Sequence, residues 1–392
     1  MTSFLPLYRQ SAPQPGDAMH CGLWFERFFS AYTAGFDDID HEQRNEWLNE
    51  FSHAHKTVGD QDVLKAKAEH MQGLAASQGG QARIYHCAGS FITGLGNPHP
   101  LENGFTWHHT LGTPYLPGSA VKGLVRAVIE TAFQGEAQAR SALLQRWFGT
   151  AEKGDVPEHS GSFIFMDALP VRRCQLHVEV MTPHMNKWYE KGRKAPLDVD
   201  TQPGDWHAPV PITYLTARDL FLQVIILPRP GAGDTAVLQQ ELQDLWQALD
   251  YGLQYLGAGG KTAIGMGQMR RDEKEEKKFN ERFNEIQQKK QREAELKSLS
   301  PAMQEVKAFI NEFSDQHAQY VSINPNKPTK QKLNGVLHNK ARALTKKALE
   351  SADWSTDEKR AAAEAIEEWL PKLVQIELKD VRKMLAALKG NT

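Results

Sequence analysis

The chain has 392 residues, with 46 Lys plus Arg against 48 Asp plus Glu and a formal net charge of −2 at pH 7. This length favours two or three domains, and the near-neutral balance excludes a protein that is basic over its whole surface. The longest apolar stretch, 220–227, is interrupted by Gln223 and is far shorter than the ~20 residues of a membrane span, so no membrane partner is expected.

The amino terminus lacks the basic start and the apolar run of about 7 to 15 residues that a secretory signal requires. The cysteines Cys21, Cys87 and Cys174 are widely spaced, which is not the pattern of a disulfide framework. We therefore expect a cytoplasmic protein with reduced thiols.

Charge and glycine content divide the chain near residues 80 and 272. Residues 1–80 carry a net charge of −5, residues 81–272 carry −1 and residues 273–392 carry +4, and only two of the 30 glycines lie after residue 272. We expect a mainly helical N-terminal segment over 1–80 packed on the core, a turn-rich domain over 81–272, and an α-helical extension over 273–392.

Strand and helix periodicities alternate in the middle domain. Apolar residues recur every three or four positions after Ser119, which predicts a helix over 119–133 with Ser119 as its N-cap. The other predicted elements, in chain order, are a strand over 82–93, strands over 162–168, 175–181 and 220–227, a helix over 236–256 and a strand over 263–269. This order is typical of an α+β, ferredoxin-like (RNA-recognition-type) domain enlarged by insertions, among them the polar segment 182–211.

The loop and helix start over 93–127 contain the first set of candidate binding residues. Asn97 and His108 supply hydrogen-bonding groups among several glycines, and Lys122 and Arg126 are four residues apart, away from the apolar stripe of the helix that begins at Ser119. Two cations beside a helix N-terminus suit a phosphodiester backbone. An ordinary solvated helix face has the same pattern.

The insertion carries a second set of candidates. Trp188 and Tyr189 are interleaved with cations, of which Lys187 is the nearest. Aromatic rings of this kind stack on splayed bases while the cations hold phosphates. A protein-docking loop would have the same composition.

The third set is a glycine-rich segment after the second predicted helix. Missing Cβ atoms, free backbone N–H groups and a Lys can form a concave phosphate site, although a glycine C-cap followed by a tight hairpin has the same sequence. A Walker A phosphate loop is excluded, because Tyr255 stands where that motif requires Gly and the segment follows a helix instead of a strand. The candidate contacts are Gly257, Gly259, Gly260, Lys261, Thr262, Gly265 and Gly267.

Metal and nucleophile patterns are weak. The chain has no HExxH or paired CxxC spacing, and Cys174-x-x-His177 is a single pair on a predicted strand, so we expect no metal and no cofactor. His108 or His109 could do acid/base work in a metal-independent ribonuclease, but no partner residue is evident in the sequence.

The C-terminal extension begins with a charged helix, and a basic stretch without acidic residues follows over 327–347. This stretch fits a nucleic-acid face or a solvated one. The last helices carry enough apolar residues for a small bundle of their own.

Several segments together resemble a known family. Residues 257–267 match the GxG-x5-GxG signature of the RAMP superfamily, the RNA-binding proteins of CRISPR-Cas systems. With TGLGNPHPLENGF at 93–105, YLPGSAVKGLVRA at 115–127, FMDALP at 165–170 and VEVMTPHM at 178–185, the chain is similar to the family of sixth Cmr subunits of type III-B effector complexes. The resemblance covers roughly residues 81–272.

The resemblance implies a ferredoxin-like RAMP fold with a thumb-like insertion at about 182–211, in a non-catalytic subunit that caps the backbone of an RNA-guided antiviral complex. It implies that the partners are the CRISPR RNA guide, its duplex with target RNA, and other Cmr subunits. The glycine-rich segment and the Lys122/Arg126 face then become expected guide contacts. A guide-processing endoribonuclease of the same superfamily and a purely structural adaptor are the alternatives. The resemblance does not reach residues 273–392.

Overall fold

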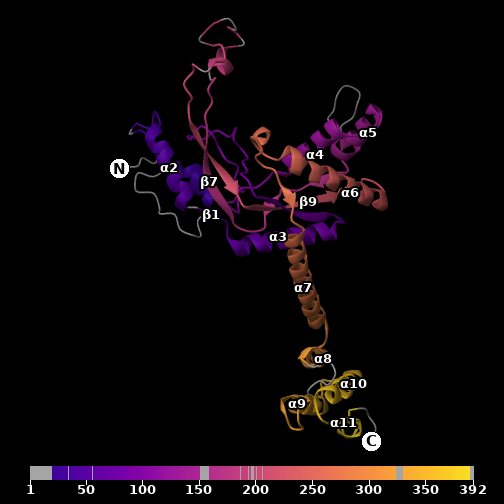
Figure 1. The fold of residues 1–392 in the computed structure, drawn as a ribbon. Helices are drawn as coiled ribbons and strands as arrows, with labels where there is room; N and C mark the ends of the chain where they lie inside the picture. The colour runs from indigo at the N-terminus through magenta and orange to yellow at the C-terminus, as the bar shows by residue number, and fades with distance from the viewer. Residues whose placement is uncertain are drawn as a thin grey trace. The chain divides into compact units, whose positions relative to one another are not determined.

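The computed structural model describes residues 20–33, 35–54, 56–150, 159–185, 187–192, 194–195, 198–199, 201–204, 206–323 and 330–388. Parts of the expected 1–80 segment, of the 182–211 insertion and of the 327–347 basic stretch lie outside these ranges. The chain divides into two compact units, residues 1–279 and 280–392 (Figure 1). None of the described helices is both long and apolar enough to cross a bilayer.

The central antiparallel sheet of the first unit is covered on both faces. Its strands, in spatial order, are β10 (Arg270–Arg271), β2 (Gln81–Cys87), β9 (Leu220–Pro228) and β5 (Phe163–Phe165), and β6 (Leu169–Pro170) also pairs with β9. Helices α4 (Gly118–Ala132) and α6 (Thr235–Tyr251) pack on one face, and α3 (Gln61–Ser77) packs on the other (Figure 1). Two covered faces explain why the apolar run in β9 is continuous instead of alternating.

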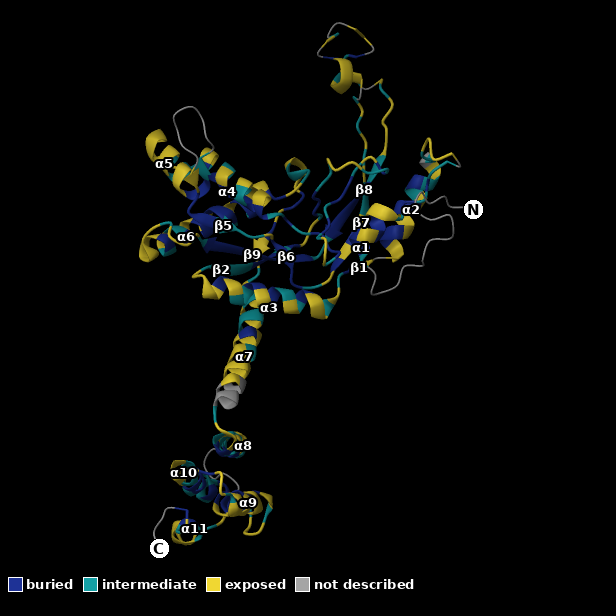
Figure 2. Ribbon diagram, turned by 180° about the vertical axis from the view of Figure 1, so that it is seen from behind, coloured by how far each residue is buried: buried dark blue, intermediate teal, exposed yellow. Residues whose placement is uncertain are grey.

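A second sheet joins the amino-terminal helices to the domain. Strands β1 (Thr57–Val58), β7 (Cys174–Met181) and β8 (Ile212–Arg218) form it, and α2 (His41–Ala54) contacts β7 and β8. Helix α1 (Cys21–Arg27) adds the aromatic side chains of Trp24 and Phe25 to the main core. Figure 2 colours the ribbon by burial, and β9 is dark blue in it. The described residues between β7 and β8 extend away from the end of this sheet, and among them Trp188–Gly192 form a π-helical turn, η1 (Figure 1).

The remaining elements of the first unit follow α4. Helix α5 (Ala137–Phe148) leads into the two-stranded sheet of β3 (Gly149–Thr150) and β4 (His159–Ser160). This hairpin is short, and the α4 and α5 helices pack together beside it.

Two local predictions are wrong, and one strand was not predicted. Residues 263–269 form no strand, because Gly265 and Gly267 have φ of +89° and +69°, and a 3-10 turn, η3 (Thr262–Ile264), stands there instead. Ser119 is not the N-cap of α4, since the helix begins at Gly118 and Pro117 is the capping position. The sequence reading also missed β8. The strand over 220–227 and the helix that begins near 119 are confirmed.

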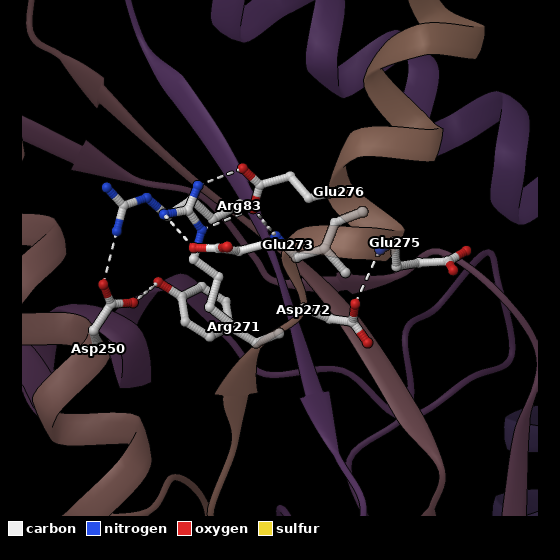
Figure 3. A network of polar contacts seen from close by, with 9 residues as sticks. Arg83, Asp250, Arg271, Asp272, Glu273, Glu275 and Glu276 are labelled. Carbon is white, nitrogen blue, oxygen red and sulfur yellow. Dashed lines mark hydrogen bonds and ion pairs between the residues drawn. The ribbon is translucent and has the colours of Figure 1, made fainter.

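The last strand of the central sheet continues directly into helix α7 (Glu273–Ser298), and Figure 3 shows this junction. Asp272 donates its backbone N–H to Ile84 O at 2.8 Å, and its carboxylate accepts the Glu275 N–H at 2.9 Å as a helix cap. The Arg271 guanidinium forms two hydrogen bonds with Glu276, of 2.6 and 3.0 Å. The start of α7 is therefore fixed to β2 and β10.

The second unit has its own hydrophobic core. It contains α8 (Pro301–Ile323), α9 (Val336–Glu350), α10 (Thr356–Leu373) and α11 (Leu378–Leu385), and their apolar side chains form one buried cluster. The described part of the basic stretch lies largely on α9. Two of its cations are paired with carboxylates of α8, Lys340 with Glu312 and Lys347 with Glu305. These pairs reduce the positive charge that the sequence suggested for this helix.

Candidate nucleic-acid interface

The glycine-rich loop 257–267 is built onto the segment that follows β2. Gly260 donates its N–H to Ile92 O at 2.7 Å, and Gly267 donates to Ser90 O at 2.8 Å. The loop also closes on itself, because Ala258 donates to Gly267 O at 2.9 Å. The backbone of residues 90–92 therefore fixes the conformation of the loop.

Three glycines of the loop are required by close backbone contacts, and the first is Gly257, where a Cβ would stand 2.7 Å from Met266 O. A Cβ on Gly259 would stand 2.2 Å from Ile92 O, and one on Gly267 would stand 1.8 Å from Ala258 O. Gly265 also has a positive φ, of +89°, but a Cβ there would meet no atom within 4 Å. One side of the loop is thus packed against the domain, whereas the Gly265 side is open.

The loop offers hydrogen-bond donors and a cation. In the described part of the chain, the backbone N–H groups of Gly259, Lys261 and Thr262 donate no hydrogen bond. Lys261 itself is in the left-handed region, with φ of +57°, and its Nζ lies 5.1 Å from the centroid of the Tyr214 ring. Free amides beside a partly exposed ammonium can bind an anionic oxygen.

A polar cluster under the loop connects it to the second sheet. The Glu179 carboxylate on β7 accepts hydrogen bonds from Ser90 Oγ and from the Arg218 guanidinium, the latter at 3.0 Å, and Arg218 Nε also donates to Ser90 Oγ at 3.0 Å. Burial would raise the pKa of Glu179, but the bonds from Ser90 and Arg218 outweigh it and lower that pKa. Burial, followed by the nearby Glu179, raises the pKa of Tyr214. The cluster therefore holds a charged carboxylate beside Tyr214, the ring that Lys261 approaches.

Segment 93–105 lies beside the glycine-rich loop, so the structure brings two predicted sets together. A Cβ on Gly260 would approach the Leu95 side chain to 2.9 Å. Asn97 is exposed, and its Nδ2 donates to Thr106 Oγ1 at 3.3 Å, which closes the turn of this segment. Asn97 therefore has a structural role next to the loop, and its predicted RNA contact stays a prediction.

His108 is part of a turn. Its Nδ1 accepts the backbone N–H of Leu111 at 3.2 Å and that of Thr110 at 3.3 Å, which requires an unprotonated Nδ1. Burial, and then the charge of Lys67, lower the pKa of His108. The side chain is half-buried, and its Nδ1 lone pair already accepts hydrogen bonds from the chain's own backbone.

The cations of α4 are engaged within the protein. Lys122 Nζ donates to the carbonyl oxygen of Phe148 at 2.8 Å, and Arg126 pairs with Glu130 at 2.8 Å. The helix start is occupied as well, because the Asp167 carboxylate accepts the Gly118 N–H at 2.7 Å, while Ser119 is exposed beside it. An anion at this helix end would have to displace Asp167, so the α4 face is a weaker candidate than the loop.

The candidates in the insertion lie on η1. Lys187 and Tyr189 are exposed, the latter by 76%, and Trp188 is half-buried with its ring over Gly192. Within the described residues, no hydrogen bond or ring contact links these three side chains to the glycine-rich loop. They form a separate candidate surface.

Sequence reasoning missed Asp167, Glu179, Tyr214 and Arg218 as parts of the site. Asp167 and Glu179 lie in the segments 165–170 and 178–185, two of those on which the family resemblance rests. That resemblance was the signal that could have identified them. Tyr214 and Arg218 stand on β8, which the sequence reading did not predict. Cys174 and His177 are three residues apart on β7, so they point to opposite faces and form no common metal site.

Comparisons with known proteins match the same part of the chain as the family resemblance in its sequence. Residues 85–270 match the family model described as RAMP superfamily. The chain is 24% identical over 234 residues to the CRISPR system Cmr subunit Cmr6 of Pyrococcus furiosus, a match that covers 45% of this chain and 64% of that relative.

Two solved structures are also similar. One is a cryo-EM structure of the type III-B Cmr-beta complex bound to cognate target RNA, at 19% identity and a TM-score of 0.44, covering 59% of this chain and 73% of that one. The other is the crystal structure of Cmr6 from Pyrococcus furiosus, at 21% identity and a TM-score of 0.28, covering 49% and 98%.

Proposed function

We propose that this chain, whose residues 85–270 form a RAMP superfamily domain, is a non-catalytic, RNA-binding subunit of a type III-B CRISPR (Cmr) effector complex. In this proposal it caps the backbone of the complex in the cytoplasm and contacts the CRISPR RNA guide, the duplex of the guide with target RNA, and neighbouring Cmr subunits. The similarity to the Cmr6 subunit of Pyrococcus furiosus supports the assignment.

The strand order supports the finer fold assignment. Read along the chain, β2, α4, β5, β9, α6 and β10 alternate as in a ferredoxin-like domain, and their spatial order is β10, β2, β9, β5. We therefore propose a ferredoxin-like core for residues 81–272, with 182–211 as its thumb-like insertion.

The observation that carries the proposal is the set of unused backbone amides beside Lys261 in the glycine-rich loop. Gly259 and Gly267 hold the loop against residues 90–92, and among the described residues the amides of Gly259, Lys261 and Thr262 are left without a hydrogen-bond partner. Such a site neutralises a phosphate without reading a base, which is what a subunit that binds guides of many sequences needs. Lys261, with the amides of Gly259 and Thr262, is therefore our primary RNA contact, and Arg126 and the η1 residues are secondary ones.

The non-catalytic role is supported by the state of His108. Its Nδ1 accepts two backbone N–H groups and its pKa is lowered by burial, so the ring is used to stabilise a turn. A general acid needs a protonated ring that faces the substrate. We therefore propose that the chain holds RNA without cleaving it.

The assignment is tested by RNA binding over a salt series. We expect Lys261→Ala to weaken binding of single-stranded RNA and to reduce the slope of log K against log salt by about 0.7 to 1. Lys261→Arg should keep the slope, and Lys274→Ala, which removes an exposed cation of α7 outside the loop, should leave it unchanged. An unaltered slope for Lys261→Ala would exclude the loop as the phosphate site.

Catalysis and assembly need separate measurements. We expect labelled repeat RNA to stay intact when it is incubated with the chain in EDTA. A cleavage product that disappears with His108→Ala or His109→Ala would favour the endoribonuclease instead. We also expect the chain to co-purify with the other Cmr subunits when they are co-expressed.

A further inference from the structure

Two tyrosines next to the glycine-rich loop are exposed to an unusual degree. Tyr251, at the end of α6, and Tyr255, in the turn that follows, are 46% and 61% exposed. Their ring centroids are 4.9 Å apart with an interplanar angle of 46°, so the rings form an open wedge. Beyond Gly257, Ile264 at the tip of the loop is 71% exposed.

The tyrosines do not contribute to the core. Leu249 and Leu253, on the same turns of the chain, are fully buried and supply the contact with the rest of the domain. In the described part of the protein, the hydroxyl groups of Tyr251 and Tyr255 form no hydrogen bond. Single exposed apolar residues are normal on a surface, but a pair of aromatic rings in mutual contact beside a loop of unused amides points to a ligand.

A π-helical turn, η2 (Gly252–Leu256), sets the position of this pair. The turn ends with a 2.9 Å hydrogen bond from Gly257 N–H to Gly252 O, so the glycine-rich loop begins two residues after Tyr255. Gly252 permits a close approach to α4, since a Cβ there would lie 3.0 Å from Leu124 and Val128. π-turns are rare and often mark functional sites.

We propose that Tyr251 and Tyr255 form a stacking surface for the bases of single-stranded RNA whose backbone the glycine-rich loop holds. This inference rests on the proposed function and adds a base contact to the phosphate contact at Lys261. Stacking on tyrosine tolerates every base, so it stabilises a bound strand without sequence preference. A cleft of about 460 Å³ lies at the same end of α6, and neither tyrosine lines it. Its lining is Gln254, Arg270, Arg271 and Met269 with the carboxylates of Asp250 and Glu273, so it offers both donors and acceptors.

RNA fits this surface better than a protein neighbour does. The glycine-rich loop, with the unused amides of Gly259, Lys261 and Thr262, follows the wedge directly in the chain, whereas the core of a protein interface is depleted of polar and charged groups. Aromatic faces next to a cation and free amides are the combination that binds bases and phosphates of one strand together.

The experiment uses the full chain and single-stranded RNA oligonucleotides with 2-aminopurine at successive positions. For wild type we expect one or two positions at which the fluorescence is quenched on binding, as stacking requires. Tyr255→Leu and Tyr251→Leu should restore the fluorescence and lower RNA affinity about fivefold or more each, with the salt slope unchanged. Tyr255→Phe, which keeps the ring, should behave as wild type.

The outcomes separate this inference from the proposed function. If Lys261→Ala reduces the salt slope but the Tyr→Leu variants bind and quench as wild type does, the stacking surface is wrong and the phosphate site stands. If wild type binds no RNA, both fail. Loss of subunit assembly in Tyr255→Leu with unchanged RNA affinity would assign the tyrosines to a protein contact and overturn the inference. Thermal unfolding of each variant checks that the fold is retained.

Discussion

Lys122 Nζ, on α4, donates a 2.8 Å hydrogen bond to the carbonyl oxygen of Phe148, the last residue of α5. This bond satisfies one of the carbonyl groups that a helix end leaves free, and it places an ammonium at the negative end of the helix dipole. We expect Lys122→Met to lower the free energy of unfolding in urea by about 1 to 2 kcal/mol.

Arg126→Met is the matched control on the same helix. Arg126 is exposed and pairs with Glu130 one turn away, so its loss should cost less than about 0.5 kcal/mol. A Lys122→Met variant of normal stability, with a salt slope for RNA binding reduced as in Lys261→Ala, would show that Lys122 binds phosphate after all.

Gly259→Ala should disrupt the glycine-rich loop more than Gly265→Ala does. Both positions have φ near +90°, so both variants carry backbone strain of about 1 kcal/mol. Only at Gly259 would the new Cβ also meet a backbone oxygen, Ile92 O, at 2.2 Å. We expect Gly259→Ala to lose at least about 2 kcal/mol of unfolding free energy and most RNA binding. Equal effects of the two changes would contradict the close contact.

Glu179→Gln tests the polar cluster under the loop. The hydrogen bonds that lower the pKa of Glu179 below 4.5 stabilise the fold above that pH, and the stabilisation is lost as pH falls through the folded-state pKa. We therefore expect the variant to be about 1 to 3 kcal/mol less stable than wild type at pH 7. The difference should shrink below pH 4.5, as followed by urea unfolding across pH.

Glu190→Gln, at an exposed site of the insertion, is the control for the Glu179 experiment. It should match wild type at each pH. A stability difference for Glu179→Gln that stayed constant down to pH 3 or so would mean that the carboxylate charge is not the source of the effect.

His99 should make the fold sensitive to mild acid. Its Nδ1 accepts the Leu101 N–H at 3.1 Å, its Nε2–H donates to Phe25 O at 3.0 Å, and burial lowers its pKa below 6.5. The neutral ring therefore stabilises the fold above pH 6.5, and this contribution is lost as pH falls through the lowered pKa. We expect the unfolding free energy of wild type to fall as the pH drops below 6.5, and that of His99→Gln to fall less.

Part of this pH dependence should survive in His99→Gln, because the pKa of His108 is lowered as well. His109→Gln, at an exposed position, serves as the control and should keep the full wild-type dependence. Identical slopes for wild type and His99→Gln would contradict the prediction.

Periodicity predicted the elements that bury a continuous apolar surface. The helix after Pro117 and the strand of β9 follow from side chains repeating at helical or strand spacing, and both are confirmed. Strand β8 was not predicted, because it buries polar residues such as Thr216. The Thr216 hydroxyl donates hydrogen bonds to the Glu179 carboxylate and to the His177 carbonyl oxygen on the neighbouring strand. When a polar residue is buried because it bonds to a residue far away in the chain, the strand does not show the alternation of apolar and polar residues that predicts it.

From the sequence, the candidate site could be predicted only as a glycine-rich loop with free backbone N–H groups and a lysine. Adjacent glycines with a Lys indicated a close approach of two chains, but the partner segment 90–92 lies more than 160 residues earlier and no spacing rule connects them. The sequence also did not show which of the lysines is engaged within the protein and which is available to bind RNA. Lys122 and Lys261 look alike in the sequence, yet a helix end binds one of them and an aromatic ring supports the other.

The junction between β10 and α7 decides where the tail can be removed. Charge and glycine content change at residue 272, but Glu276 neutralises Arg271, and Phe279 packs against the cluster that includes Ile84 and Phe221. Truncation after residue 272 would remove Glu276, the ion-pair partner of Arg271, and Phe279, which covers apolar side chains of the sheet. Deletions that aim to remove only the helical extension should therefore keep Phe279, so that a lost activity can be attributed to the tail instead of to a damaged domain.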